Sequence, residues 1–369
     1  MIKVLITSVG SLVGQNILDA LENRRKYLTI IGINSIVESQ RIYRCDRAYL
    51  APKTSSLDFE TRFHDIVQKE NPDLILAGRD EDVVFLANYR KNVVTSKHLI
   101  PVGEPYLAEM MLDKFKTHLF TEKHNLPFAA TLLYQNDSDS SKLERFIAIH
   151  GFPLLVKPRQ GFGSLNVYIV TNQEQVNNLI KDNQEVMFQE YLSPAKNLDL
   201  LQEQLTKGIP LSFQVPNDEH MVSQVLISRK GTILDYISTK QSLVMGRTEY
   251  ARVYNDPALN RMIELYANNL AKNGWWGFLN IQSRLDRFGK WKVFELNPRL
   301  SGATSTRLNL GLDEIGLILK DEKPEWLFPI EDNPSRRQNH IFKYLTDHSV
   351  ADCDMEQLRT EGIWNKHNK

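Results

Sequence analysis

Three oxygen-bearing side chains near the end of the sequence could bind a metal ion. Gln282 and Glu295 lie on two expected strands joined by a turn at 286–289, and Asn297 follows shortly after. Antiparallel pairing brings such residues within reach of one another. Mg²⁺ prefers oxygen ligands and fills its remaining positions with water and phosphate oxygens. The pattern also fits paired polar residues on a solvated sheet face, but the rigid N-P-R turn at 297–299 favours the metal site.

A lysine before a glycine-rich loop could bind a phosphate group. Lys157 ends the apolar run PLLVKP, and Gly161, Gly163 and Ser164 follow in the sequence GFGS. The lysine would meet a phosphate as a point charge, while the loop offers backbone N–H donors. The alternative is an ordinary hairpin.

The apolar run at 186–192, VMFQEYL, ends in polar residues. Its end could form a hinge between domains and present backbone amides to the edge of an adenine base. The alternative is a simple edge strand.

The surrounding patterns indicate elements that would position these residues. Strands alternate with helices over residues 1 to about 100, which predicts a mostly parallel α/β sheet. A linker helix with Leu112, Phe115, Leu119 and Phe120 on one face follows, ending near residue 125. From residue 153 the pattern becomes strand, glycine-rich loop, strand, helix and strand, which predicts a small α+β lid. Further expectations are an irregular insertion at 193–210, strands near 220–228 and 232–239, a helix at 259–270, and a weakly patterned tail.

The composition narrows the class of protein and its partners. The 369 residues are too many for one ordinary core, which predicts two or three subdomains with clefts between them. Lys and Arg together number 45, as do Asp and Glu, so nucleic acid is not an expected partner. The two cysteines, Cys45 and Cys353, form no disulfide or zinc pattern. No apolar segment approaches the roughly 20 residues that span a bilayer. We therefore expect a cytoplasmic protein that binds no membrane.

The order of these motifs resembles the ATP-grasp superfamily, and most closely its branch related to the large subunit of carbamoyl-phosphate synthetase. The resemblance extends from residue 1 to about 315. It implies an α/β and α+β fold, in which a preATP-grasp Rossmann-like domain precedes the two-subdomain ATP-grasp fold. The implied divisions are the Rossmann-like domain at 1–110, the linker helix and lid at 111–192, the C-terminal subdomain with the metal site at 193–320, and an extension of unknown role at 321–369.

The resemblance also implies roles for individual residues. Lys114, after Asp113, and Lys157 would bind ATP phosphates, beneath a flexible flap at 160–164. Lys157 and Arg299 would act in catalysis, and Arg299 would stabilise the acyl phosphate or the incoming carboxylate. Asp80 and Glu81 match an acidic turn of the family. The remaining assignments are Gly161, Gly163 and Ser164 for the flap, Gln189, Glu190, Tyr191 and Leu192 for the adenine hinge, Glu219 for ribose, Gln282, Glu295 and Asn297 for Mg²⁺ or Mn²⁺, and Lys240, Arg247 or Arg252 for a further basic residue near the lid.

The activity implied is that of an ATP-dependent carboxylate–amine ligase. It would form an acyl phosphate, join it to an amine, and release ADP and phosphate. Its partners would be a small-molecule carboxylate and an amine, with substrate contacts from 79–82, 240–252 and 301–307, and homodimers are common in the family.

Three alternatives remain. One is a kinase of the same fold that releases an acyl phosphate, and another is a non-catalytic ATP-binding module. The third, a nicotinamide-dependent Rossmann enzyme, is disfavoured by the G-x-x-x-G spacing of Gly10 and Gly14 and by Asn34 at the end of the second strand.

Overall fold

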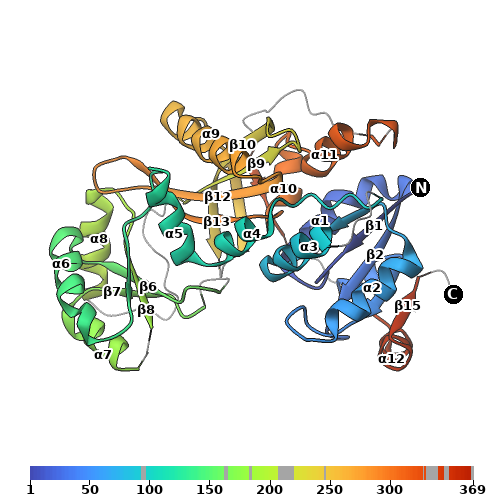
Figure 1. Cartoon of the computed structure of the whole chain (residues 1–369), viewed down its shortest axis with the longest axis horizontal. Coiled ribbons are helices and arrows are strands. Elements are labelled where there is room, and N and C mark those ends of the chain that lie inside the picture. The colour runs from blue at the N-terminus through green and yellow to red at the C-terminus, as the bar shows by residue number, and fades with distance from the viewer. Residues whose placement is uncertain are drawn as a thin grey trace.

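The computed structural model contains three sheets arranged along its long axis (Figure 1). It describes residues 1–92, 97–161, 165–182, 185–206, 220–244, 247–326, 328–329, 340–344 and 349–366. The N-terminal sheet lies at one end, the lid sheet at the other, and the largest sheet between them. This mixture of parallel α/β and antiparallel layers confirms the predicted fold class.

The N-terminal sheet is parallel except at one edge. Its strand order is β15-β3-β2-β1-β4, and only β15 runs antiparallel. The apolar runs that form β1 and β2 are buried on both faces, as expected for strands covered by helices. The elements are β1 (Ile2–Ile6), α1 (Leu12–Leu21), η1 (Glu22–Tyr27), β2 (Leu28–Asn34), η2 (Ile42–Arg44), β3 (Arg47–Leu50), α2 (Phe59–Glu70), β4 (Leu74–Leu76) and α3 (Asp80–Asn92).

The sequence predicted one linker helix with a single apolar face, but the linker consists of two helices. Helix α4 (Pro105–Leu112) ends at Asp113, whose extended backbone begins α5 (Lys114–Lys123). The Asp113 carboxylate accepts hydrogen bonds from the Phe115 and Lys116 amides at 2.9 and 3.1 Å. This N-cap restarts the helix, so α5 buries Thr117 and Thr121, whereas Leu119 is 49% exposed.

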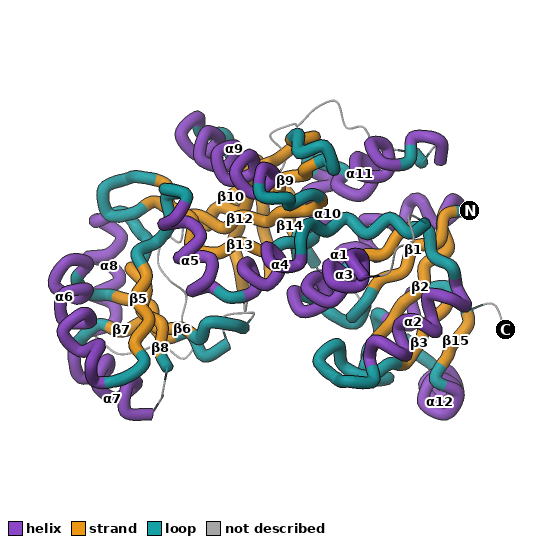
Figure 2. The backbone as a smooth tube through the Cα atoms, viewed as in Figure 1, coloured by secondary structure: helices purple, strands orange, loops and turns teal. Residues whose placement is uncertain are grey.

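The lid sheet is antiparallel, with the order β5-β8-β6-β7. Helices pack on its outer side (Figure 2). The prediction of an irregular insertion at 193–210 was wrong for the first part of this segment, which forms helix α8. Leu198, Leu201 and Leu205 are spaced for one helix face, and Leu201 is buried. The elements are β5 (Thr131–Tyr134), η3 (Asp137–Asp139), α6 (Ser140–His150), β6 (Leu154–Lys157), β7 (Tyr168–Val170), α7 (Gln173–Asp182), β8 (Val186–Glu190) and α8 (Ala195–Thr206).

The central sheet is antiparallel, with the order β13-β12-β9-β10-β11-β14. Helix α9 covers one face, and α10 lies toward the N-terminal domain (Figure 2). The two strands and the helix expected between 220 and 270 all form. The elements are β9 (His220–Ile227), β10 (Ile233–Val244), β11 (Arg247–Val253), α9 (Pro257–Lys272), β12 (Gly277–Leu285), β13 (Trp291–Asn297), α10 (Thr304–Asn309), α11 (Glu314–Glu322) and η4 (Pro324–Trp326).

The C-terminal segment contributes a strand to each of two sheets. Strand β14 (His340–Phe342) pairs with β11, and after α12 (Asp352–Glu361), β15 (Ile363–Asn365) pairs with β3. The Trp364 ring packs edge-on against Tyr43 at 5.4 Å between centroids. The weakly patterned tail is therefore an integral part of the fold.

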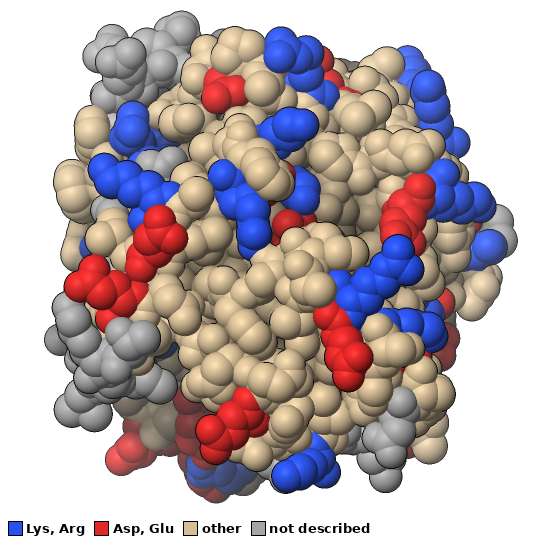
Figure 3. Space-filling model, turned by 90° about the vertical axis from the view of Figure 1, so that its left-hand side faces the viewer, with Lys and Arg blue, Asp and Glu red and all other residues tan. Residues whose placement is uncertain are grey.

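Within the described ranges, no helix has the length and hydropathy needed to cross a membrane. Basic and acidic side chains intermix on the face shown in Figure 3, in agreement with the equal numbers of both charges.

We predict that Trp364→Ala lowers the free energy of unfolding by about 3 kcal/mol or more, because it removes a large buried side chain. Urea denaturation would measure the loss. The exposed Tyr344→Ala serves as the control, with an expected change within about 0.5 kcal/mol. Equal effects of the two substitutions would mean that β15 does not stabilise the N-terminal sheet.

Candidate functional site

The three predicted metal ligands lie on one face of the β12–β13 hairpin. Gln282 is the register partner of Glu295, and Asn280 is the partner of Asn297. Directly paired residues project to the same face of a sheet, so Gln282, Glu295 and Asn297 converge. Together they offer one carboxylate and two amide oxygens, which suits Mg²⁺ completed by phosphate and water oxygens. No cluster of three His, Cys, Asp or Glu ligands occurs in the described part of the chain.

Two lysines from different elements lie around this hairpin. The Lys114 Nζ, at the start of α5, lies 3.9 Å from the Glu295 Oε1 and donates to the Gly161 carbonyl at 3.1 Å. The Lys157 Nζ, at the end of β6, donates to the Gln189 Oε1 at 2.7 Å and to the Phe294 carbonyl at 3.5 Å. The structure thus brings together residues from the linker, the lid and the central sheet.

The Lys157 ammonium lacks sufficient negative charge around it. The Lys157 pKa is lowered to about 7, chiefly by burial; Glu295 opposes this shift, and the positive charges of Lys114 and Arg284 add to it. A phosphate group would supply the missing negative charge and restore a higher pKa. This electrostatic imbalance makes the cluster suitable for a polyanion.

The predicted hinge follows β8 and is tied to the central sheet. Gln189 is fully buried and donates to the Thr131 hydroxyl at 2.9 Å. The Glu190 carboxylate accepts from the Lys292 Nζ at 2.6 Å and from the Ala130 amide at 2.7 Å. Its side chain is therefore engaged by protein groups. The backbone at Gln189 and Glu190 pairs with β5 and β6, so the backbone beyond β8, at Tyr191 and Leu192, is the part suited to a base edge. Tyr191 and Leu192 are both buried at the end of β8.

Some predicted residues lie elsewhere or outside the described ranges. Lys240 on β10 pairs with Arg252 on β11 and with Met221 on β9. The Met221 side chain packs in the core. Lys240 and Arg252 lie on the sheet face opposite Gln282 and therefore do not meet the metal-ligand positions. Arg247 instead lowers the pKa of Arg41 in the N-terminal domain, after the larger effect of burial. Gly161 is described, whereas Gly163, Ser164 and Glu219 lie outside the described residues.

A buried histidine beside the cluster was missed by the sequence reasoning. His220 begins β9, and its ring packs edge-on against Phe294 at 5.5 Å. Burial and the nearby Arg284 lower the His220 pKa to about 3, with a hydrogen bond to Gln282 opposing the shift, so the ring is neutral at pH 7. The available signal was the alternation along β9, which puts His220 and Gln224 on the face that carries Gln282. The Phe294 ring also faces the cations of Lys157 and Arg284, at 5.9 and 5.6 Å.

Arg299 lies at the boundary with the N-terminal domain. Its Nη2 forms an ion pair with the Asp80 Oδ2 at 2.8 Å, and its Nη1 donates to the Leu300 carbonyl at 3.0 Å. The acidic turn and the N-P-R turn, 219 residues apart, therefore meet directly.

Comparison with solved structures identifies the fold. The sequence matches no family model and no curated protein. The structure is similar to an L-amino acid ligase from Bacillus licheniformis, with a TM-score of 0.62, 13% identity, and coverage of 89% of this chain and 78% of that one. It is also similar to N5-carboxyaminoimidazole ribonucleotide synthetase from Thermotoga maritima, with a TM-score of 0.60, 18% identity, and coverage of 90% and 77%.

A third similar structure is the biotin carboxylase domain of 2-oxoglutarate carboxylase from Hydrogenobacter thermophilus, solved as a dimer with MgADP, ADP and bicarbonate. Its TM-score is 0.63 at 15% identity, with coverage of 87% of this chain and 69% of that one. At these identities the likeness concerns the fold, and the chain has the ATP-grasp fold that its motif order predicted.

We predict that the stability cost of burying Lys157 depends on pH. Between its folded pKa of about 7 and its ordinary value of 10.5, the unfolded chain binds the proton and the folded chain does not. The free energy of unfolding therefore rises with pH in this window, by up to about 1.4 kcal/mol per pH unit, and the full cost is present below pH 7. Lys157→Met removes this dependence.

Urea denaturation of wild type and Lys157→Met at pH 7, 8 and 9 would measure this pH dependence of the free energy of unfolding. The stability of the variant relative to wild type should fall as the pH rises, whereas the exposed Lys123→Met should show no such trend. A constant difference for Lys157→Met would mean that this lysine keeps its proton throughout the window.

Proposed function

We propose that the chain is an ATP-dependent carboxylate–amine ligase that works through an acyl phosphate. The observation that carries the proposal is the Lys114–Glu295–Lys157 cluster. Lys114 forms an ion pair with Glu295, whose charge also acts on Lys157, and further oxygen donors lie on the same sheet edge. Such a site suits a nucleoside triphosphate and its metal ion. The similar structures support this, because one holds MgADP and another is an amino acid ligase.

ATP would lie between the lid and the central sheet. The hinge of Gln189, Glu190, Tyr191 and Leu192 would lie beside the adenine, and Lys114 and Lys157 would face the phosphates. Mg²⁺, with Mn²⁺ as a substitute, would neutralise phosphate charge while held by Gln282, Glu295 and Asn297. The resemblance adds Gly161, Gly163 and Ser164 as the flap and Glu219 as the ribose ligand.

In the first step, a carboxylate oxygen of the substrate attacks the γ-phosphorus, and the bond to the ADP oxygen breaks. Lys157 and Lys114 stabilise the charge on the transferring group, and Arg299 orients the incoming carboxylate. In the second step, an amine attacks the acyl carbon, phosphate leaves, and the amine proton passes to solvent. The resemblance implies a flap that closes over ATP and excludes water, which would otherwise hydrolyse the acyl phosphate.

The domain division of 1–110, 111–192, 193–320 and 321–369 belongs to the same proposal. In this division the Rossmann-like domain and the central sheet enclose the substrate, while the lid holds ATP. A homodimer is also proposed, as in the biotin carboxylase domain that was solved as a dimer.

We predict amine-dependent release of ADP and phosphate from Mg-ATP on a panel of carboxylates and amines. Glu295→Ala and Lys157→Ala should each lower the rate at least about 100-fold, because each removes charge stabilisation of phosphoryl transfer. The exposed Glu109→Ala is the control and should keep the wild-type rate.

Each other outcome would identify a different activity. Release that persists without an amine and gives no amide would identify a kinase that forms acyl phosphates. ATP binding without turnover would identify a binding module, and no ATP binding at all would overturn the proposal.

A further inference from the structure

The ion pair between Arg299 and Asp80 joins two domains at the expected substrate site. Arg299 lies two residues beyond Asn297, and Asp80 is the first residue of α3. The inference drawn from this pair concerns the substrate class and rests on the proposed function.

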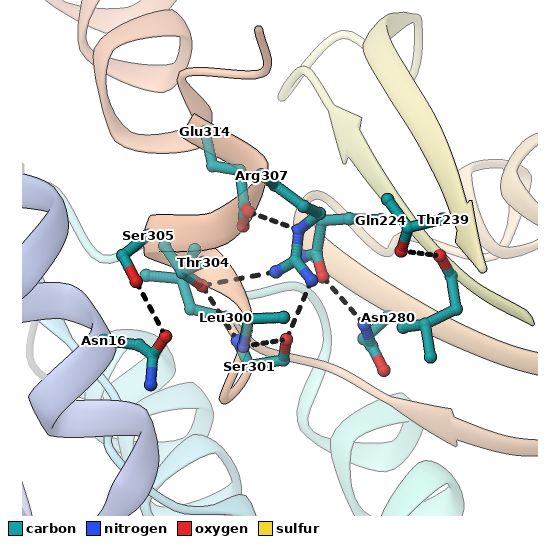
Figure 4. Close-up of polar contacts among 12 residues, drawn as sticks. Asn16, Gln224, Thr239, Asn280, Leu300, Ser301, Thr304, Ser305, Arg307 and Glu314 are labelled. Atoms are coloured by element: carbon teal, nitrogen blue, oxygen red, sulfur yellow. Dashed lines mark hydrogen bonds and ion pairs between the residues drawn. The ribbon is translucent and has the colours of Figure 1, made fainter. Parts of the chain in front are cut away.

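Arg299 is held firmly from the side of the central sheet. Its backbone carbonyl accepts from the Gln224 Nε2 at 3.2 Å, and the Gln224 Oε1 accepts from the Asn280 Nδ2 at 3.0 Å. Figure 4 shows Gln224 and Asn280 next to the buried Arg307, which forms an ion pair with Glu314 at 2.6 Å. The segment that carries Arg299 is therefore fixed by buried polar contacts.

Asp80 is held as firmly from the N-terminal side. The turn before it packs tightly on the end of β1, since a Cβ at Gly78 would lie 2.2 Å from the Thr7 carbonyl oxygen. The Ser11 hydroxyl donates to the Gly78 carbonyl at 2.8 Å, and the nearby Asp82 carboxylate accepts from Thr7 at 2.7 Å. Neither partner of the ion pair is on a loosely held segment.

The ion pair is incomplete. The Arg299 Nε and the Asp80 Oδ1 are both buried, and neither has a hydrogen-bond partner among the described residues. Burying such groups without a partner is unfavourable, so native structures usually pair them with protein, water or ligand. Within one pair of side chains, the site thus offers a cationic donor and an anionic acceptor that remain to be satisfied.

We propose that this pair recognises an α-amino acid as the carboxylate substrate. The carboxylate would accept from the Arg299 Nε, and the ammonium would donate to the Asp80 Oδ1. Because an α-amino acid carries both groups on one carbon, a single ligand satisfies both atoms. A carboxylic acid without the amino group would leave the Asp80 oxygen unpaired, and a site built around such a bond discriminates strongly against that analogue.

The test compares α-amino acids with the matching acids that lack the amino group, such as alanine with propionate and glutamate with glutarate. ATP-dependent phosphate release with a saturating amine gives kcat/KM for each pair of substrates. Wild type should prefer the best amino acid over its analogue by at least about 100-fold. Asp80→Asn should lower kcat/KM for the amino acid alone and reduce the preference to less than about tenfold.

Asp65→Asn is the matched control. It makes the same substitution in the same domain, but Asp65 is exposed on α2 and lies outside the expected substrate contacts. This variant should keep the wild-type preference. Asp80→Glu, which retains the charge but moves it by one methylene, should raise KM for the amino acid and leave that of the analogue unchanged. A shift confined to the amino-bearing substrate excludes a purely structural role for Asp80.

Two results would overturn the inference while leaving the ligase function intact. One is equal use of both substrates by wild type, and the other is an unchanged preference in Asp80→Asn; either would mean that water alone satisfies these atoms. Failure of wild type to turn over ATP with any carboxylate would instead overturn the proposed function, and this inference with it.

Discussion

Lys157 is a buried lysine, and the carboxylate that favours its charged form, Glu295, also lies close to Lys114. Burial and excess positive charge both favour the neutral amine, which is why the Lys157 pKa is lowered. The arrangement becomes favourable once a polyanion is present, because each phosphate oxygen then finds a donor already in place. Much of the surrounding structure keeps these three charged side chains close to one another.

The lid and the central sheet are connected at several points close to the cluster. The Val293 backbone on β13 bonds to the Pro127 carbonyl and to the Ala129 amide, at 3.0 and 2.8 Å, just before β5 begins. The ion pair of Lys292 with Glu190 ties the same strand to the end of β8. Both hinge contacts involve β13, which also carries Glu295 and Asn297. The strand that would hold the metal ion is therefore also the strand that anchors the lid to the central sheet.

Local sequence patterns were sufficient for the hairpin and for the strand that carries Lys157, because alternation and turn residues determine both without distant contacts. The patterns did not predict α8, because its few leucines are interspersed with polar residues. They also did not predict two linker helices, because the N-cap at Asp113 starts a new helix despite the apolar pattern. The pairing of Asp80 with Arg299 could not be derived locally, since packing between domains creates it. The same holds for His220, whose low pKa arises from burial and from Arg284 on another strand.

The contribution of the C-terminal segment to two sheets has a consequence for biosynthesis. Strand β3 pairs with β15 along one edge, and Tyr43 receives Trp364 from more than 300 positions later in the chain. Until residues 363–365 have been synthesised, the first domain has an open strand edge and an uncovered aromatic ring. Exposed edges of this kind invite pairing with other nascent chains, and distant contacts form late. Synthesis of β15 is thus the step that completes the sheet of the first domain.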